Sequence, residues 1–165
     1  MNELLIRPME ELDLPQAAAI EKEAITPPWS EQAFRESLGL EHTILLAAIQ
    51  DGQVAGYCVC YQSFEEGEIT NVAVKKELRG QGIAGKLLEK LGSYGKKRGL
   101  ERYILEVRAG NEPAIHLYER SGFTRVGIRK GFYEQPVEDA VIMGGTTIKE
   151  GAVIRHCIVA ENVQI

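Results

Sequence analysis

Cysteine is scarce in this chain, and long apolar runs are missing. Three cysteines occur among 165 residues, an odd number that does not suggest a disulfide framework. Cys58 and Cys60 stand two positions apart in an apolar run, so we expect them to share one face of a strand as buried thiols. No run of about 18 apolar residues offers a membrane span. Residues 1–7 lack the basic start and long apolar core of a signal peptide, which predicts a cytoplasmic protein.

An excess of positive charge is also absent. The net charge is −5, and no basic patch is interleaved with aromatic residues, which argues against nucleic-acid binding. A basic peptide or protein substrate is compatible with this charge. His42, His116 and His156 have no cysteine or carboxylate neighbours at ligand spacing, so no metal site is expected. The length and the 44% apolar content fit one globular domain.

Glycine, by contrast, is concentrated at one informative place. Gly80, Gly82 and Gly85 follow the apolar run 69–74 and lead directly into an amphipathic helical pattern. Glycine can adopt positive φ, and the free N–H groups at a helix start attract anions. The backbone of residues 80–85 therefore predicts a pyrophosphate cradle. A tight strand-to-helix connection without a ligand is the alternative.

The order of motifs is more specific than this glycine spacing. Arg79, Gly82 and Ala84 form an R-x-x-G-x-A pattern, followed by a helix, the strand 102–107 and the segment 111–123. This order resembles the GNAT superfamily of acetyl-CoA-dependent N-acetyltransferases. The resemblance implies an α/β fold with a central mixed, mostly antiparallel sheet flanked by helices, and acetyl-CoA as co-substrate. No Gly-Lys-Ser/Thr sequence ends the loop, so it is not a Walker A motif.

Within the superfamily, the chain is most similar to the RimI family, which acetylates the N-terminal α-amine of a ribosomal protein. Four local segments carry this similarity: 28–31, 71–74, 105–109 and 128–133. Three positions depart from the RimI pattern: Gly110 replaces a common serine, and Gly131-Phe132 replaces an Asn-Tyr pair. The resemblance implies a protein or peptide N-terminus as the acceptor, with a ribosomal protein as the candidate.

The same resemblance implies which residues hold the cofactor. Main-chain groups of the segment Val72-Ala73-Val74 would hold the pantetheine and the thioester. The backbone of the cradle would hold the pyrophosphate, with the positive charge of Arg79 beside it. The cradle residues are Gly80, Gln81, Gly82, Ile83, Ala84 and Gly85. Asn111 would contact the cofactor from the other side of the cleft, although it is also a candidate N-cap of the following helix.

It also implies the reacting groups. Glu106 matches the proposed general base, with pairing to Arg108 as a structural alternative. Glu68, on the strand before the cradle, is the rival base beside the substrate. Tyr118 matches the general acid that protonates the sulfur of CoA, and ordinary core packing is its alternative.

Two aromatic residues are predicted to bound the acceptor entrance. They are Trp29 and Tyr133, and Trp29 could equally be a cap over the core. The function predicted from these residues is direct acetyl transfer to a protein α-amine within a ternary complex. Acceptors such as lysine, a polyamine or a small metabolite amine remain open, as does a CoA-binding regulatory module. The oligomeric state is not predicted.

Local patterns predict the elements of this domain. Asp51-Gly52 suits a two-residue hairpin turn with positive φ, and helices are expected after Asp13, Ser30, Gly82 and Asn111. The expected strands are 4–6, 43–50, 54–64, 68–74, 102–107, 124–129 and 139–143, with residues 130–136 separating the last two.

The acetyltransferase domain is expected to cover residues 1–143, and the character of the sequence then changes. Ile142, Ile148, Ile154 and Ala160 recur every six residues, which resembles the hexapeptide repeat of left-handed β-helices. About one coil is present, whereas a solenoid needs roughly three repeats. Residues 144–165 are therefore interpreted as an appendage and not as an independent domain.

Overall fold

The computed structural model describes residues 3–134, 136–145 and 163–164. Four α-helices are described: α1 (Leu14–Ala24), α2 (Glu31–Leu38), α3 (Ile83–Lys97) and α4 (Glu112–Arg120). Two short 3₁₀ helices are η1 (Glu11–Asp13) and η2 (Lys76–Leu78). The strands are β1 (Leu4–Pro8), β2 (Thr43–Gln50), β3 (Gln53–Ser63), β4 (Glu66–Val74), β5 (Arg102–Arg108), β6 (Thr124–Glu134), β7 (Val137–Gly145) and β8 (Val163–Gln164).

All these strands belong to one sheet. Its order is β1-β2-β3-β4-β5-β7-β6, and β8 pairs with β4 outside that path. Every neighbouring pair on the path is antiparallel except β4 and β5, which are parallel. The predicted α/β fold with a mixed, mostly antiparallel sheet is therefore confirmed.

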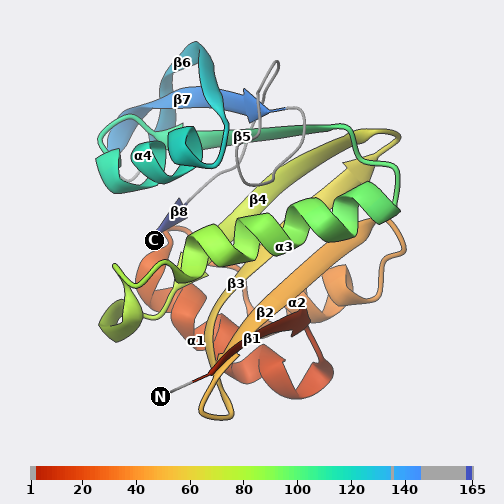
Figure 1. The fold of residues 1–165 in the computed structure, drawn as a ribbon. Coiled ribbons are helices and arrows are strands. Elements are labelled where there is room, and N and C mark those ends of the chain that lie inside the picture. Colours follow the sequence, from red (N-terminus) through yellow and green to blue (C-terminus); the bar gives the residue numbers. More distant parts are fainter. Residues whose placement is uncertain (1–2, 135, 146–162, 165) are drawn as a thin grey trace.

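Helices cover both faces of this sheet (Figure 1). α3 crosses one face and packs its apolar side on the strands, while α1 and α2 lie against the other face. The predicted amphipathic pattern is confirmed, because Ile83, Leu87, Leu88 and Leu91 on one side of α3 are all buried. Each face thus has its own apolar core, as expected for a sheet that packs helices on two sides.

The parallel pairing between β4 and β5 is short, and this makes a ligand site between the two strands possible. Only three residue pairs join the two strands, from Glu66↔Arg102 to Glu68↔Ile104. Beyond Glu68 the strands diverge, as Figure 1 shows. The second half of β4 therefore has no β5 partner for its main chain. Strand β8 pairs with part of that edge, in parallel, at Val72 and Ala73.

The local predictions agree with the structure except near the end of the sheet. Asp51 and Gly52 form the turn between β2 and β3 with φ of 53° and 74°, as predicted. The predicted break at residues 130–136 is wrong, because β6 continues to Glu134. The turn-like Gly131 has φ of 62° and lies in a register irregularity of the β6–β7 ladder between Arg129 and Tyr133.

The two cysteines of β3 are buried and free, as expected. Burial raises the pKa of Cys58 to about 12 and raises that of Cys60 well above its usual value. Neither residue supplies a thiolate near neutral pH.

β7 ends at Gly145, two residues beyond the predicted domain boundary at Met143. The other repeat positions, Ile148, Ile154 and Ala160, lie outside the described residues. Among the helices of the described ranges, none has the length and apolar composition to cross a membrane.

Candidate functional site

The glycine-rich loop between η2 and α3 has the backbone of an anion cradle. Gly80 and Gly82 have φ of 79° and 81°, a region that favours glycine, and an added Cβ at either would meet nothing within 4 Å. Open space therefore lies beside the loop. The first hydrogen bond of α3 runs from the Lys86 N–H to the Gly82 carbonyl at 3.1 Å. The N–H groups of residues 83–85 are thus left without a helical acceptor and carry the positive end of the helix dipole.

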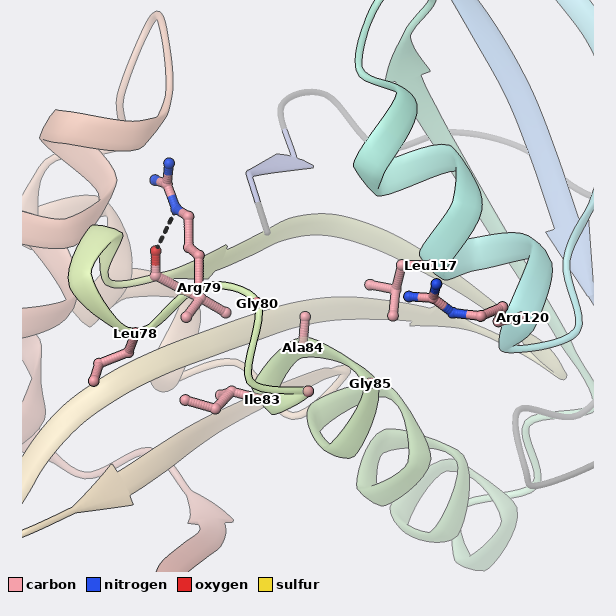
Figure 2. Close-up of a pocket in the computed structure, with 10 residues that line it drawn as sticks. Leu78, Arg79, Gly80, Ile83, Ala84, Gly85, Leu117 and Arg120 are labelled. Carbon is pink, nitrogen blue, oxygen red and sulfur yellow. Dashed lines mark hydrogen bonds between the residues drawn. The ribbon is translucent and has the colours of Figure 1, made fainter. Parts of the chain in front are cut away.

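A cavity of about 140 Å³ lies against this loop (Figure 2). Most of the predicted cofactor residues line it, but Val72, Ala73, Gln81 and Asn111 do not. The lining comprises Val74, Leu78, Arg79, Gly80, Gly82, Ile83, Ala84, Gly85, Leu117 and Arg120. Glycines in the left-handed region, free amides and arginine side chains together suit a pyrophosphate group.

The opposite wall of the cavity comes from α4, through Leu117 and Arg120, which were not among the predicted cofactor residues. Leu117 and Arg120 stand three positions apart, so they share one side of α4. The Cδ1 atom of Leu117 lies 3.6 Å from where a Cβ of Gly85 would stand, which brings α4 against the start of α3. Figure 2 shows both side chains reaching from α4 towards the loop. Arg120 thereby provides a second positive charge at the cavity.

Arg79 is partly committed to the protein itself. Its Nε donates to the main-chain carbonyl of Val74 at 3.0 Å, the dashed line in Figure 2. This bond ties the loop to the end of β4.

Asn111 is confirmed as the N-cap of α4. Its side-chain oxygen accepts a hydrogen bond from the Ala114 N–H at 3.3 Å. Capping fixes the start of the helix that carries Leu117, Tyr118 and Arg120.

Glu106 is a carboxylate placed inside the protein, on β5 beyond the end of the β4–β5 pairing. It is fully buried, and the Nε of Arg129 on β6 lies 2.9 Å from its Oε1. The arginine suggested as a structural partner, Arg108, donates to the Pro136 carbonyl at 3.0 Å and lies 3.4 Å from Glu138. Glu68, the rival base on β4, is exposed. The two candidate bases therefore differ sharply in environment.

Tyr118 is both a core residue and a candidate donor. Its ring is buried and meets Phe123 edge to face, with centroids 5.5 Å apart. Its hydroxyl has no hydrogen-bond partner within the described part of the chain. Burial raises the pKa of Tyr118 well above its usual value, so the hydroxyl stays protonated at neutral pH. Such an orphaned buried donor is costly unless a ligand accepts its hydrogen bond.

The two aromatic residues predicted at the acceptor entrance have different surroundings. Trp29 is half-buried and packs edge to face on Phe34 and Tyr61, with centroids 5.3 and 6.4 Å away. Tyr133 is buried, and the guanidinium of Arg108 lies 4.3 Å from its ring centroid. Trp29 thus has the packing of a cap and remains partly accessible.

No cluster of metal-ligating side chains occurs among residues 3–134, 136–145 and 163–164.

Comparisons with known proteins identify the family of this chain. The model of the acetyltransferase (GNAT) family matches residues 10–123. The [ribosomal protein bS18]-alanine N-acetyltransferase of Escherichia coli K12 is 38% identical over 140 residues, covering 84% of this chain and 94% of that protein. The enzyme of the same name from Haemophilus influenzae is 34% identical over 142 residues, covering 84% and 96%.

A solved structure is similar as well. The ribosomal-protein-S18-alanine N-acetyltransferase from Escherichia coli matches with a TM-score of 0.80 and 35% identity, covering 91% of this chain and 97% of that chain. The chain belongs to the acetyltransferase (GNAT) family and is an acetyltransferase.

Proposed function

We propose that this enzyme transfers the acetyl group of acetyl-CoA to the N-terminal α-amine of a ribosomal protein of the bS18 type. The observation that carries the proposal is the cavity between the cradle at the start of α3 and helix α4. The buried hydroxyl of Tyr118 also belongs to α4. The similarity to bS18-alanine N-acetyltransferases over 84% of the chain supports the choice of acceptor. A ribosomal substrate would place the enzyme in the cytoplasm.

In the proposed complex, the cradle amides and the guanidinium groups of Arg79 and Arg120 hold the pyrophosphate. Main-chain groups of residues 72–74 hold the pantetheine and place the thioester near the divergence of β4 and β5. Asn111 and Gln81 are proposed as further cofactor contacts. Free amides at the start of α3 and the positive-φ glycines support this arrangement.

The amine attacks the thioester carbon directly, and the C–S bond then breaks to release CoA. The described cysteines do not favour an acyl-enzyme, because burial raises the pKa values of Cys58 and Cys60. Glu106 takes the proton that the amine loses. An α-amine has a pKa of about 8, against about 10.4 for lysine. A larger fraction of the α-amine is therefore already neutral near pH 7, and a weak base is enough to deprotonate it.

Tyr118 donates its hydroxyl proton in a hydrogen bond to the departing sulfur. The raised pKa of this phenol makes it a weak acid, so its main effect is to stabilise the charge that develops on sulfur. Donation to sulfur would also give the orphaned hydroxyl the partner that it lacks among the described residues.

A comparison of acceptors tests the proposal. The wild-type enzyme is assayed with acetyl-CoA and a peptide beginning with alanine, the same peptide with a blocked N-terminus, free lysine and a polyamine. We expect turnover with the free N-terminus only. Equal acetylation of the blocked peptide would move the acceptor to lysine, and turnover with the polyamine alone would replace the protein substrate. Binding of acetyl-CoA without turnover on any acceptor would favour a regulatory module.

A further inference from the structure

Glu21 is a buried carboxylate that the proposed reaction does not use. It lies on α1, is fully buried and accepts hydrogen bonds from three neutral groups. They are the Trp29 main-chain N–H at 3.0 Å, the Asn71 side-chain amide at 3.0 Å and the Tyr57 hydroxyl. Within the described ranges no basic side chain forms an ion pair with it.

Burial destabilises the charged form of this carboxylate. It raises the pKa of Glu21, and the hydrogen bonds from Tyr57, Trp29 and Asn71 act in the opposite direction. Apolar packing between α1 and the sheet would not need a carboxylate here, and a buried charge often costs more than it returns. A specific geometric role accounts for this residue better than packing alone.

The geometry shows what the carboxylate connects. A single oxygen, Oε2, accepts both from the main chain at Trp29 and from Asn71 on β4. Asn71 directly precedes Val72-Ala73-Val74, the segment proposed to hold the thioester. Trp29 belongs to the link between α1 and α2, which has no ladder hydrogen bonds to the sheet. Glu21 thus connects the link that contains Trp29 directly to β4 through two hydrogen bonds.

We propose that Glu21 is a positioning residue for the acceptor: it holds Trp29 at a fixed place relative to β4, so that the incoming amine meets the thioester. The inference rests on the proposed function and on the prediction from the sequence that Trp29 bounds the acceptor entrance. Glu21 acts through Trp29 and Asn71 and need not touch the substrate itself.

Trp29 provides a direct readout, because it is the one tryptophan of the chain. Tryptophan fluorescence therefore reports on this link without any assay of activity. In Glu21→Ala we expect a red-shifted emission and stronger quenching by acrylamide than in the wild type. Glu21→Gln should be intermediate, because an amide oxygen can still accept from the Trp29 N–H through a weaker neutral bond.

Kinetics with the alanine-initiated peptide separate positioning from stability. Glu21→Ala should raise the peptide KM by about tenfold, the scale of one lost hydrogen bond to a charged group, while the Kd for acetyl-CoA changes less than about twofold. Tyr57→Phe is the matched control, since it removes a donor to Oε1 and leaves both bonds to Oε2. It should keep the wild-type peptide KM and the wild-type quenching.

Three outcomes would overturn the inference. The first is wild-type quenching and peptide KM in both Glu21 variants, or in Glu21→Gln alone where Glu21→Ala does not fold. The second is an equal loss of acetyl-CoA affinity and peptide affinity, which would reduce Glu21 to a support of the fold. The third is a Tyr57→Phe variant that behaves like Glu21→Ala. Failure of the proposed function is distinguishable, because the wild type would then not acetylate the peptide while the fluorescence comparison would still apply.

Discussion

At the scale of single residues, the site separates two carboxylates and a phenol by their surroundings. Glu106 is enclosed and faces Arg129, Glu68 is exposed, and Tyr118 has a buried hydroxyl. A buried group acts in a low dielectric environment, where a proton acceptor or donor interacts more strongly with a reacting atom. This contrast favours Glu106 over Glu68 as the base.

The role of Tyr118 is tested by removing only its hydroxyl. Tyr118→Phe keeps the ring that packs on Phe123, so the fold and the Kd for acetyl-CoA should change little. We expect kcat to fall by about 100-fold, within the usual range for a proton donor in the transition state. Full turnover in single-turnover measurements of the chemical step would return Tyr118 to a packing role. Because burial raises the pKa of Tyr118, its hydroxyl should remain protonated and active at pH 9.

The base is tested by comparing pH profiles. Glu106→Gln should lose most activity at pH 6.5 and recover part of it by pH 9, because an α-amine with a pKa of about 8 loses its own proton as the pH rises. Glu68→Gln is the matched control on the neighbouring strand and should show the smaller loss at low pH. A larger defect in Glu68→Gln would transfer the role of base to that residue.

At the scale of elements, the cradle joins β4 to α3 through a loop whose shape depends on glycine. Gly82 is the N-cap of α3 in the left-handed region, and its place beside the cavity leaves room for a ligand. Gly82→Val should therefore strain the loop and weaken acetyl-CoA binding by at least about tenfold, or 1.4 kcal/mol. Calorimetry measures this affinity, and circular dichroism checks that the helices remain. Unchanged affinity in a folded variant would contradict the cradle assignment.

Local signals explain why so much of this site could be predicted from the sequence. The glycine loop before α3, the Asn111 cap and the inward face of α3 depend on residues within one or two turns of each other. The structure shows the positive φ of Gly80 and Gly82, the cap and the buried face of α3. The break predicted at residues 130–136 is wrong because Gly131, a turn-forming residue type, lies within a strand irregularity. In that irregularity the Gly131 N–H donates to the side chain of Asp139 on β7 at 2.8 Å.

Contacts set by tertiary structure could not be predicted. Glu106 is paired with Arg129, which reaches it from β6, although β7 lies between β6 and β5 in the sheet. Arg120 lines the cavity only because α4 packs on the start of α3. The hydrogen bond from Asn71 to Glu21 joins two residues that stand 50 positions apart in the chain. Such pairings follow from register and packing, which no local pattern specifies.

At the scale of the whole molecule, the last described strand, β8, lies beside β4. β8 pairs in parallel with β4 at Val72 and Ala73, the segment proposed to hold the pantetheine. Figure 1 shows β8 near the region where β4 and β5 diverge. Main-chain groups of Val72 and Ala73 that pair with β8 are not available for the proposed contacts with the pantetheine amides. Acetyl-CoA should therefore have to displace β8 from β4.

Weakening the β8 pairing should thus improve cofactor binding. Proline at residues 163 and 164, introduced as Val163→Pro with Gln164→Pro in the full chain, removes both N–H groups of β8. A net backbone hydrogen bond is worth about 0.5–1.5 kcal/mol, so we expect the KM for acetyl-CoA to fall about three- to tenfold. Val163→Ala keeps the N–H and serves as the control, with the wild-type KM. An unchanged KM in the proline variant would contradict this prediction. It would show that loss of the β4–β8 pairing does not affect acetyl-CoA binding, so that β8 and acetyl-CoA do not compete.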